Sequence, residues 1–593
     1  MQFPGPKDRL RGLLFISAKA MAMNAVSLKN QKTPVVFTAK ARCRDCYRCV
    51  RVCPAGAIRM HDGQAQVLPE RCIACGTCII SCPQHAKEYR PELTKVLDML
   101  ASDETVTLSL APSFVSYYHE WQHRRLPSAL RLAGFRLVGE TAAGAWHTAQ
   151  ASKEYIEANP QQSHICTACP AVVNYVRHCF PQLGGLLVPV ASPMRMHARL
   201  IKEKLPRAKV VFAGPCVAKK DEAAWQAAHE EVNAVLTFEE LDELLKIKEI
   251  DLKLCEESSF DETVSGQARL FPLEGGLLRT AGMDDNLLSG QTLAVSGFRE
   301  VKQALEALRE TGEKMVVEPL WCKNGCVAGP SFSNGSNFVN GRRRVLDFSR
   351  KNPGSKSEAL SRFTRTKFDP LVRQQKTIRS EEAILEVLRK TGKHTAADEL
   401  NCTACGYPSC REKAIAVLDG MAEIQMCMPF MRRTAESRFE TIVARDPNGI
   451  VLLAEDMSII HMNPAFKKMF SCSDALVGRK ISYLIDPDTF EKLAGGNEEV
   501  VRSVMHFAPY NLICHVVAYT LPEQRQFAGI FVDITDRQSS REKLDELKSE
   551  ALIKAQELVD HQIGMAQEMA KFLGEHTAKG ELLLKRLIDA LGK

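Results

Sequence analysis

The feature that most constrains this chain is a near-repeated cysteine pattern close to its amino end. Residues 43–54 read CRDCYRCVRVCP and residues 72–83 read CIACGTCIISCP, so both follow the form C-x2-C-x2-C-x3-C-P. Three thiolates spaced by two residues wrap three corners of a 4Fe-4S cube, and in this spacing the fourth cysteine reaches the other cube. Structural zinc is the disfavoured alternative, because zinc knuckles use two cysteine pairs and not runs of four that end in proline.

The spacing divides these eight cysteines between two cubes. The first cube is predicted to be held by Cys43, Cys46, Cys49 and Cys82, and the second by Cys72, Cys75, Cys78 and Cys53. Two cubes held in this way resemble a bacterial two-cluster ferredoxin domain, here assigned to residues 35–92. Such cubes conduct electrons, so another part of the chain is expected to supply or accept them.

Composition limits the class of protein to which these cubes belong. The chain has 593 residues, enough for about four domains, and its 21 cysteines predict metal binding in a reducing, cytoplasmic compartment. No stretch approaches the roughly 18 apolar residues of a membrane span, and residues 13–16 are too short for a secretory signal. The net charge of +7 is spread along the chain without a polybasic tail, so no nucleic-acid partner is expected. Residues 1–34 are predicted to be an extension, with Met21 or Met23 as an alternative start.

Three further cysteine loops lie in a region predicted to be an α/β domain, residues 103–375, where apolar runs typical of buried strands alternate with helical stretches. The loops read Cys-Thr-Ala-Cys-Pro at 166–170, Gly-Pro-Cys-Val-Ala-Lys-Lys at 214–220 and Cys-Lys-Asn-Gly-Cys at 322–326. No single loop has enough thiolates for a cluster. Four of the cysteines could converge in the folded chain: Cys169, Cys216, Cys322 and Cys326.

These loops, behind a two-cluster ferredoxin pattern, resemble the iron-only (FeFe) hydrogenase family. The resemblance implies an H-cluster, in which Cys169, Cys216, Cys322 and Cys326 hold a 4Fe-4S cube. It implies that Cys326 also bridges to a two-iron subsite that carries CO, cyanide and a bridging dithiolate. It further implies that Lys219 donates a hydrogen bond to a cyanide and that Ser192 forms another polar wall of the pocket.

The chain departs from this family at Ala168. Catalytic members carry a cysteine there that shuttles protons to the subsite, whereas a methyl group can neither give nor accept a proton. A positioned acid or base contributes about 10^2- to 10^4-fold to a rate. Cys166 lies two residues further back, and Glu154 is the acid nearest to the usual proton relay. The resemblance therefore implies slow proton delivery.

A third iron-sulfur pattern follows at residues 402–427, which read C-x2-C-x4-C-x16-C. A helix over 411–425 is expected to bring Cys427 back to Cys402, Cys405 and Cys410. The pattern resembles a small single-cube domain of anaerobic redox proteins, here residues 380–435, with zinc as the alternative.

Short strands with turn signals occupy residues 440–537. The Asn-Pro-Ala-Phe turn at 463–466 and the closing Asp-Ile-Thr-Asp-Arg at 533–537 resemble a PAS sensory domain. His461, Cys514 and His515 are interpreted as ordinary strand residues, because no C-x2-C-H haem motif is present.

Residues 538–593 are predicted to be helical, with apolar residues that recur every seven positions. Two interpretations stay open for this segment: a weak coiled coil that, with the PAS domain, joins two copies of the chain, and an amphipathic helix that lies on its own PAS domain. No glycine-rich nucleotide loop follows the PAS domain, so any phosphotransfer is expected to belong to a partner.

Together these patterns predict a multidomain α/β and α+β protein: a ferredoxin-like two-cluster domain, an α/β iron-hydrogenase core, a small Fe-S domain, a PAS domain and a carboxy-terminal helix. The predicted function is a sensory hydrogenase of low activity that reversibly oxidises H2 and relays its redox state through three accessory 4Fe-4S clusters to a kinase or phosphatase partner. One alternative is a catalytic hydrogenase that exchanges electrons with ferredoxin or another carrier. The other is a non-hydrogenase Fe-S protein without the two-iron subsite. Five cysteines are left as buried thiols by default: Cys166, Cys179, Cys255, Cys472 and Cys514.

Overall fold

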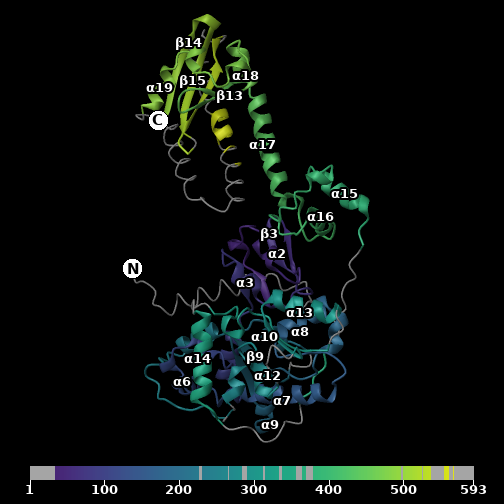
Figure 1. The fold of residues 1–593 in the computed structure, drawn as a ribbon. Coiled ribbons are helices and arrows are strands. Elements are labelled where there is room, and N and C mark those ends of the chain that lie inside the picture. The colour runs from purple at the N-terminus through teal and green to yellow at the C-terminus, as the bar shows by residue number, and fades with distance from the viewer. Residues whose placement is uncertain are drawn as a thin grey trace, which may run out of the picture. The chain divides into compact units, whose positions relative to one another are not determined.

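The chain divides into two compact units, which are described separately (Figure 1). The first comprises Met1–Glu381 with Ile415–Ala422, and the second comprises Glu382–Ala414 with Glu423–Lys593. The computed structural model describes residues 34–225, 230–262, 264, 266–283, 290–310, 314–332, 337–354, 364–368, 378–495, 499–523, 525–535, 553–559, 562 and 565. Among these residues, no helix combines the length and the apolar character needed to cross a membrane.

Two predicted segments lie largely outside the described residues. Of the amino-terminal extension, only residue 34 is described. Of the carboxy-terminal segment, residues 553–559, 562 and 565 are described, and these are helical. The choice between a coiled coil and a helix on the PAS domain therefore stays a prediction.

In the ferredoxin-like part of the first unit, the first and last strands pair with each other, and the two strands between them form a β-hairpin. Strand β1 (Val36–Thr38) runs antiparallel to β4 (Lys87–Tyr89), and β2 (Ile58–His61) pairs with β3 (Gln64–Val67). The hairpin turn is Asp62-Gly63, in which both residues have positive φ (50° and 65°), as a two-residue type I′ turn requires. Two short helices, α2 (Arg48–Val52) and α3 (Thr77–Ser81), each contain the third cysteine of a motif.

The α/β part contains two parallel sheets, as the alternation of strand and helix patterns predicts. The larger has the order β6-β5-β8-β9, and the smaller has the order β10-β11-β7. The strands are β5 (Val106–Leu110), β6 (Leu137–Glu140), β7 (His164–Ile165), β8 (Lys209–Ala213), β9 (Ala234–Leu236), β10 (Thr292–Ser296) and β11 (Val316–Leu320). Parallel strands need crossover connections, and helices supply most of them.

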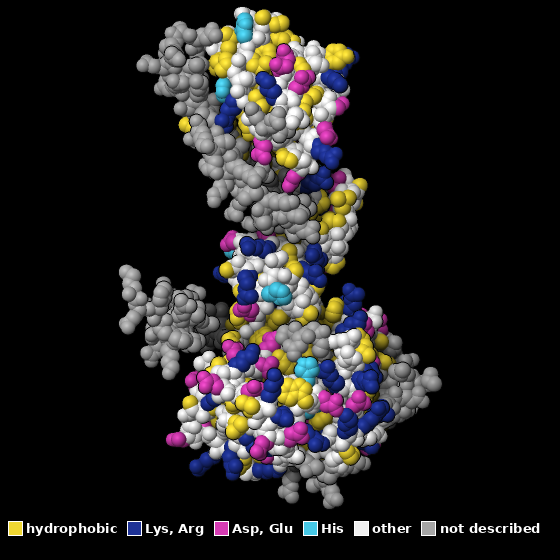
Figure 2. Space-filling model, turned by 90° about the vertical axis from the view of Figure 1, so that its left-hand side faces the viewer, with side chains coloured by type: hydrophobic (Ala, Val, Ile, Leu, Met, Phe, Trp, Pro, Cys, Tyr) yellow, Lys and Arg dark blue, Asp and Glu magenta, His cyan; other side chains and the backbone are white. Residues whose placement is uncertain are grey.

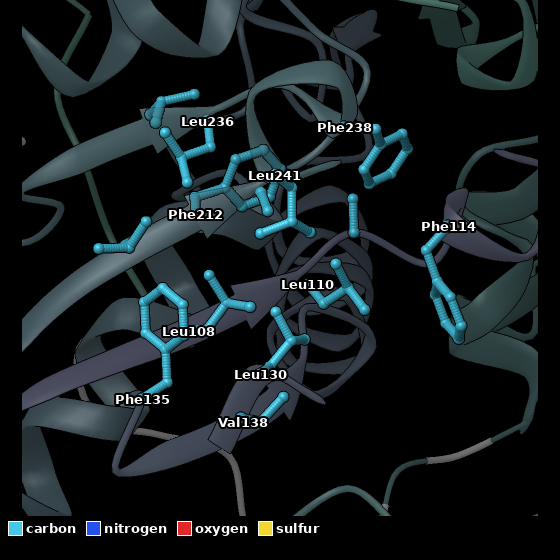
Figure 3. Packing of buried hydrophobic residues seen from close by; sticks show 14 of the residues in the cluster. Leu108, Leu110, Phe114, Leu130, Phe135, Val138, Phe212, Leu236, Phe238 and Leu241 are labelled. Atoms are coloured by element: carbon cyan, nitrogen blue, oxygen red, sulfur yellow. The ribbon is translucent and has the colours of Figure 1, made fainter. Parts of the chain in front are cut away.

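The helices around these sheets are mostly amphipathic or buried. They are α4 (Leu93–Ala101), α5 (Phe114–Tyr117), α6 (Leu126–Leu132), α7 (Ala142–Ala158), α8 (Pro170–Cys179), α9 (Pro193–Lys204), α10 (Ala218–Ala223), α11 (Phe238–Ile247), α12 (Gly276–Ala281), α13 (Phe298–Glu310) and α14 (Phe338–Lys351). Figure 3 shows apolar side chains from β5, β6, β8, β9 and the neighbouring helices in one core, including Leu108, Phe212 and Leu241. All five side chains of β5 are buried, as expected for a central parallel strand.

Helices α7 and α9 approach each other closely at one glycine. A Cβ atom on Gly144 would lie 2.3 Å from the carbonyl oxygen of Pro193 and 2.4 Å from the amide nitrogen of His197. Only glycine fits this crossing. It fixes the start of α9, where Ser192 is the N-terminal capping residue.

The second unit begins with helices around the third cysteine motif. These are α15 (Glu381–Lys390), whose first residue belongs to the first unit, α16 (Cys410–Leu418), which belongs to the first unit from Ile415 onward, and α17 (Met428–Arg445). The predicted helix over 411–425 is wrong in its carboxy-terminal half, because α16 ends at Leu418. Gly420 then takes a positive φ of 67°, which an α-helix does not contain, and a short 3-10 turn at Ile424–Met426 leads to Cys427.

The PAS region forms a five-stranded antiparallel sheet in the order β13-β12-β16-β15-β14 (Figure 1). Its strands are β12 (Gly449–Ala454), β13 (Ile459–Met462), β14 (Val500–Phe507), β15 (Leu512–Leu521) and β16 (Gln526–Asp533), with helices α18 (Pro464–Met469) and α19 (Asp488–Ala494). Asn463 of the Asn-Pro-Ala-Phe turn caps α18 by accepting from the Phe466 N–H at 2.9 Å, and it also accepts from the Ile450 N–H at 2.8 Å. One buried amide thus joins the start of β12 to α18.

Candidate metal centres

The eight amino-terminal cysteines form two groups. The first group consists of Cys49 and the three cysteines within its electrostatic range, Cys43, Cys46 and Cys82. The second consists of Cys78 and the three cysteines within its range, Cys75, Cys53 and Cys72. Burial raises the pKa of Cys49 to about 11, an effect that Lys87 opposes and the neighbouring thiols increase. The structure therefore brings together the two sets of four cysteines that the spacing predicts.

Backbone amides point at several of these sulfur atoms, as they do around cluster ligands in general. The N–H groups of Ala57, Ala74 and Ala86 donate to the Sγ atoms of Cys53 (3.2 Å), Cys72 (3.4 Å) and Cys82 (3.3 Å). These donors suit thiolates that carry negative charge.

The second group faces the α/β core of the same unit. Cys75 lies within electrostatic range of Cys322, and burial raises its pKa to about 11, while Thr77 and, to a smaller extent, the indole of Trp321 lower it. A Cβ atom on Gly76 would lie 2.5 Å from the Cβ of Pro330, so the two segments touch. Trp321 is 3% exposed and directly precedes Cys322 in the chain.

Four cysteines from three loops meet in the α/β core: Cys169, Cys216, Cys322 and Cys326. Burial raises the pKa of all four thiols, to about 12 at Cys216, and they raise the pKa of one another. A nucleophilic cysteine needs the opposite shift. The positive iron-sulfur core of a bound cube would stabilise four thiolates that otherwise repel one another. This donor set therefore fits a cube.

The last two of these cysteines sit on a loop that depends on positive φ angles. Asn324 and Gly325 have φ of 67° and 80°. A Cβ atom on Gly325 would lie 2.2 Å from the carbonyl oxygen of Pro272, to which the Cys326 N–H also donates at 2.7 Å. The loop therefore holds Cys322 and Cys326 in a fixed relation.

Lys219 is buried beside this group. Its Nζ donates to the Glu222 carboxylate at 2.6 Å and to the carbonyl oxygen of Ala168 at 3.4 Å. Glu222 is 2% exposed, so the pair is almost completely desolvated. The structure therefore places Lys219 and Ala168 together at the group, as the family resemblance implies, and it adds a carboxylate that the sequence pattern does not indicate.

Ser192 is also buried, and among the described residues its Oγ has no hydrogen-bond partner. An orphaned buried hydroxyl fits a residue that faces a bound group, because buried polar atoms are otherwise paired.

The two groups named near the usual proton relay, Glu154 and Cys166, lie in different surroundings. Glu154 is exposed on α7, so the structure does not place it in a buried relay. Cys166 is fully buried, and burial, with a smaller contribution from Glu318, raises its pKa.

Glu318 is a buried acid that sequence reasoning missed. Its carboxylate accepts the N–H groups of Leu277 and Leu278, each at 3.0 Å. Burial raises the pKa of Glu318 to about 7, while these two hydrogen bonds lower it. Its only sequence signal is an acidic residue inside an apolar strand.

In the second unit, the cysteines of the third motif line one cavity of about 400 Å³: Cys402, Cys405, Cys410 and Cys427. Two lysines that sequence reasoning missed line the same cavity, Lys393 and Lys413. Cys427 is the N-terminal capping residue of α17, and the Cys410 N–H donates to the side chain of Asn401 at 2.8 Å.

Zinc is the alternative to a cube at this motif. Within the described part of the chain, no three His, Cys, Asp or Glu side chains are close enough to hold one ion. A cube is wider than an ion, so its ligands stand further apart.

The remaining cysteines and histidines play no part in these groups. Cys166, Cys255 and Cys514 are buried, whereas Cys179 and Cys472 are partly exposed, so the default of a buried thiol is wrong for those two. His461 is exposed on β13 and His515 lies on β15, which confirms them as strand residues.

Comparison with known protein families matches four parts of the chain. Residues 104–330 match the iron only hydrogenase large subunit, C-terminal domain, and residues 35–83 match a 4Fe-4S dicluster domain. Residues 398–429 match an Fe-S cluster family, and residues 437–504 match a PAS domain.

Among curated proteins, the NADP-reducing hydrogenase subunit HndD of Solidesulfovibrio fructosivorans is 27% identical over 269 residues, which are 39% of this chain and 46% of that protein. The electron transport protein HydN of Escherichia coli is 48% identical over 48 residues, 8% of this chain and 27% of that protein. The chain thus spans less than half the length of these relatives.

Among solved structures, an FeFe hydrogenase HydA1 variant from Chlamydomonas reinhardtii has 19% identity and a TM-score of 0.37, and the match covers 44% of this chain and 92% of that one. The PAS domain of an HTR-like protein from Haloarcula marismortui has 18% identity and a TM-score of 0.16, covering 18% and 95%. The family matches therefore divide the chain into a region like the hydrogenase large-subunit domain, a 4Fe-4S dicluster domain, a further Fe-S module and a PAS domain.

Proposed function

We propose that this chain is a hydrogen sensor: a hydrogenase of low turnover whose redox state is read by its PAS domain and passed to a kinase or phosphatase. The observation that carries the proposal is Ala168: it precedes Cys169 of the core group, its side chain is an unreactive methyl group, and its backbone carbonyl accepts from the Lys219 ammonium. Slow proton delivery is tolerable in a sensor, because the signal depends on the fraction of chains that have reacted with hydrogen and not on the rate of hydrogen turnover.

The core group has the donors that an H-cluster needs. Cys169, Cys216, Cys322 and Cys326 would hold the cube, with Cys326 as the bridge to the two-iron subsite. When bound, that subsite would supply heterolytic cleavage of hydrogen, H2 = 2 H+ + 2 e−. The orphaned hydroxyl of Ser192 supports a bound polar group in this pocket.

The chain's own side chains would set the surroundings of that reaction. Lys219 offers a hydrogen-bond donor held in place by Glu222. Leu320 and Val327 are 5% and 2% exposed and keep water from the adjoining space. At Ala168, no atom can receive the released proton, so the proton must leave by a slower route.

Electrons would pass between this pocket and the amino-terminal cubes. The second cube, near Cys75, Trp321 and Cys322, is the inner one. The first cube is the outer one, because Cys46 is exposed. The surrounding residues Lys40, Arg42, Arg44, Arg48 and Arg51 are all exposed, a surface suited to an acidic electron carrier such as a ferredoxin.

The signal would then depend on coupling between cluster charge and the PAS domain. A coupling free energy of only about 1–3 kcal/mol changes the affinity for a partner by about 5- to 150-fold. A homodimer through the PAS domain and the carboxy-terminal helix would be a suitable platform for such a partner.

Infrared spectroscopy of the anaerobically matured chain tests the proposal. CO and cyanide stretching bands are expected, together with slow hydrogen turnover. Absence of these bands would instead leave a non-hydrogenase Fe-S protein. Bands accompanied by fast turnover would favour the catalytic hydrogenase.

One observation favours that catalytic alternative. Glu318, buried in the core and with a pKa raised to about 7, is a group that can exchange a proton near neutral pH. If Glu318→Gln abolished fast turnover, Glu318 would replace the missing cysteine as the proton carrier.

A further inference from the structure

The cavity of the third cysteine motif contains two buried lysines. Lys393 and Lys413 are 6% and 4% exposed and line the same space of about 400 Å³ as Cys402, Cys405, Cys410 and Cys427. Buried lysines are rare unless a negative group compensates their charge.

Lys393 contacts a thiol directly. Its Nζ donates to the Sγ of Cys427 at 3.2 Å and to the Thr391 hydroxyl at 3.0 Å. The Thr391 carbonyl accepts from the same ammonium at 3.4 Å. Lys393 is therefore held in place at the sulfur atom.

Lys413 approaches from α16, three residues after Cys410. Its Nζ donates to the Ile424 carbonyl at 3.0 Å, and it lies within electrostatic range of Cys427, Cys405 and Cys410. The two ammonium groups thus flank the cysteines from different elements.

Neither lysine has a carboxylate partner among the described residues. The other charged groups that line the cavity have partners other than the two lysines: Arg432 pairs with Glu436 at 2.7 Å, Arg433 donates to backbone carbonyls, and Asp398 accepts from the N–H groups of His394 and Thr395. The negative group that would compensate two buried ammonium ions is therefore the cluster itself.

Charge and hydrogen bonding at the sulfur atoms set the reduction potential of an Fe-S cluster. Reduction adds one negative charge to a cube, and a nearby ammonium ion stabilises the reduced form more than the oxidised form. We propose that Lys393 and Lys413 raise the reduction potential of the cluster held by Cys402, Cys405, Cys410 and Cys427, and so make it the centre on which the chain stores an electron. This rests on the cluster assignment of the proposed function.

The electron has a source under that function. Each hydrogen molecule oxidised releases two protons and two electrons, and each cube accepts one electron. A cluster of raised potential keeps its electron while the other cubes pass theirs on. Its sequence position next to the PAS domain suits it to report that hydrogen has been present.

The test is an EPR-monitored redox titration of the full, anaerobically reconstituted chain. Cys402→Ser identifies the signal of this cluster by its loss. In Lys393→Met and in Lys413→Met, the equilibrium constant for reducing that cluster is expected to fall roughly tenfold each, about 59 mV for one electron. Lys393→Arg keeps the positive charge and is expected to retain the potential, which a merely structural role of the lysine would not predict.

Lys390→Met is the matched control, since Lys390 is exposed on α15 and pairs with Glu386 at 2.7 Å. It should leave the potential unchanged. If a methionine variant does not fold, Lys393→Gln and Lys413→Gln replace it. An unmoved potential in the lysine variants would overturn the inference alone. Full iron content and an unchanged spectrum in Cys402→Ser would overturn the cluster assignment as well.

Discussion

Two four-cysteine groups of this chain, the core pocket and the pocket of the second unit, differ in how their lysines are compensated. In the core pocket, Lys219 is neutralised by the Glu222 carboxylate at 2.6 Å. In the pocket of the second unit, Lys393 contacts the sulfur of Cys427 at 3.2 Å and has no carboxylate partner among the described residues. The same donor set is therefore surrounded by a neutral ion pair in one place and by net positive charge in the other. Two groups with the same four thiol donors therefore lie in different electrostatic surroundings, and we expect these charges to give their clusters different reduction potentials.

The largest expected effect comes from giving the core pocket the proton carrier that it lacks. Ala168→Cys puts a thiol on the residue whose backbone carbonyl accepts a hydrogen bond from the Lys219 ammonium. Hydrogen turnover of the matured chain is expected to rise by about 10^2- to 10^4-fold. The measurement is a hydrogen-evolution and hydrogen-uptake assay at matched infrared band intensity.

The control for this variant is Cys166→Ala. Cys166 is fully buried two residues before Ala168 in the apolar core, so its removal should not change turnover. Equal turnover in the Ala168→Cys variant and the unchanged chain would show that proton delivery does not limit the core pocket. The sensor proposal would then lose its main support.

The second-largest effect is expected from removal of the Lys219–Glu222 ion pair in the core pocket. Glu222→Gln leaves Lys219 buried without a carboxylate, and loss of one partner of a buried pair costs about 3–5 kcal/mol. The cluster-free chain should therefore melt at a lower temperature, and cluster insertion should recover part of the loss because the cluster compensates the ammonium.

Glu157→Gln is the matched control, because Glu157 forms an exposed pair with Lys153 on α7 at 3.9 Å. Exposed pairs contribute little to stability. A melting temperature of Glu222→Gln equal to that of this control would mean that the Lys219 ammonium is compensated by another group.

The residues of these pockets can be predicted from the sequence only where their role depends on local spacing and not on contacts made by folding. Twelve cysteines could be grouped because their spacing is a local property of the chain, whereas Cys169, Cys216, Cys322 and Cys326 lie on three distant loops and were grouped only through the family resemblance. Glu222 and the lysines of the second pocket were not predicted, since their roles depend on contacts that only the folded chain creates. Glu154 is the acid nearest in sequence to the usual proton relay, and the structure leaves it exposed on α7. The break of the helix at Leu418 has a signal that was overlooked, the Gly420 that follows it.

The pH dependence of stability offers a smaller test within the core. Burial raises the pKa of Glu318 from 4.5 to about 7, so the folded core favours the protonated acid. Its contribution, about 3 kcal/mol, is fully present below pH 4.5 and is lost as the pH rises through 7. In Glu318→Gln, the melting temperature of the core should change less between pH 4.5 and 7 than in the unchanged chain, even if the variant is less stable at every pH.

Glu262→Gln is the contrasting variant. Burial raises the pKa of Glu262, but hydrogen bonds from His197 and Lys204 outweigh it, and the pKa falls to about 2. Its stabilisation is present above pH 4.5 and is lost as the pH falls through 2. This variant should therefore change the profile only on the acid side. The same flattening in both variants would show that neither carboxyl group is responsible.

The smallest expected effect concerns positive charge that lies outside any pocket. Arg44 and Arg48 are exposed around Cys46, so their charge acts on an approaching carrier and not on a buried cluster. In the double variant Arg44→Glu with Arg48→Glu, reduction by an acidic ferredoxin is expected to slow by roughly tenfold at low salt, and its dependence on ionic strength should weaken. Reduction by a small uncharged mediator should not change.

Arg71→Glu makes the comparison specific, because Arg71 is equally exposed but directly precedes Cys72 of the inner group. It should leave the reaction with ferredoxin nearly unaffected. If all three arginines mattered equally, the carrier would respond to the net charge of the domain and not to a docking face. In that case the rate of electron exchange with the carrier would depend on the total charge of the domain. The charges beside the core pocket and the pocket of the second unit act instead on the reduction potentials of the clusters, and so on which cluster holds the electron.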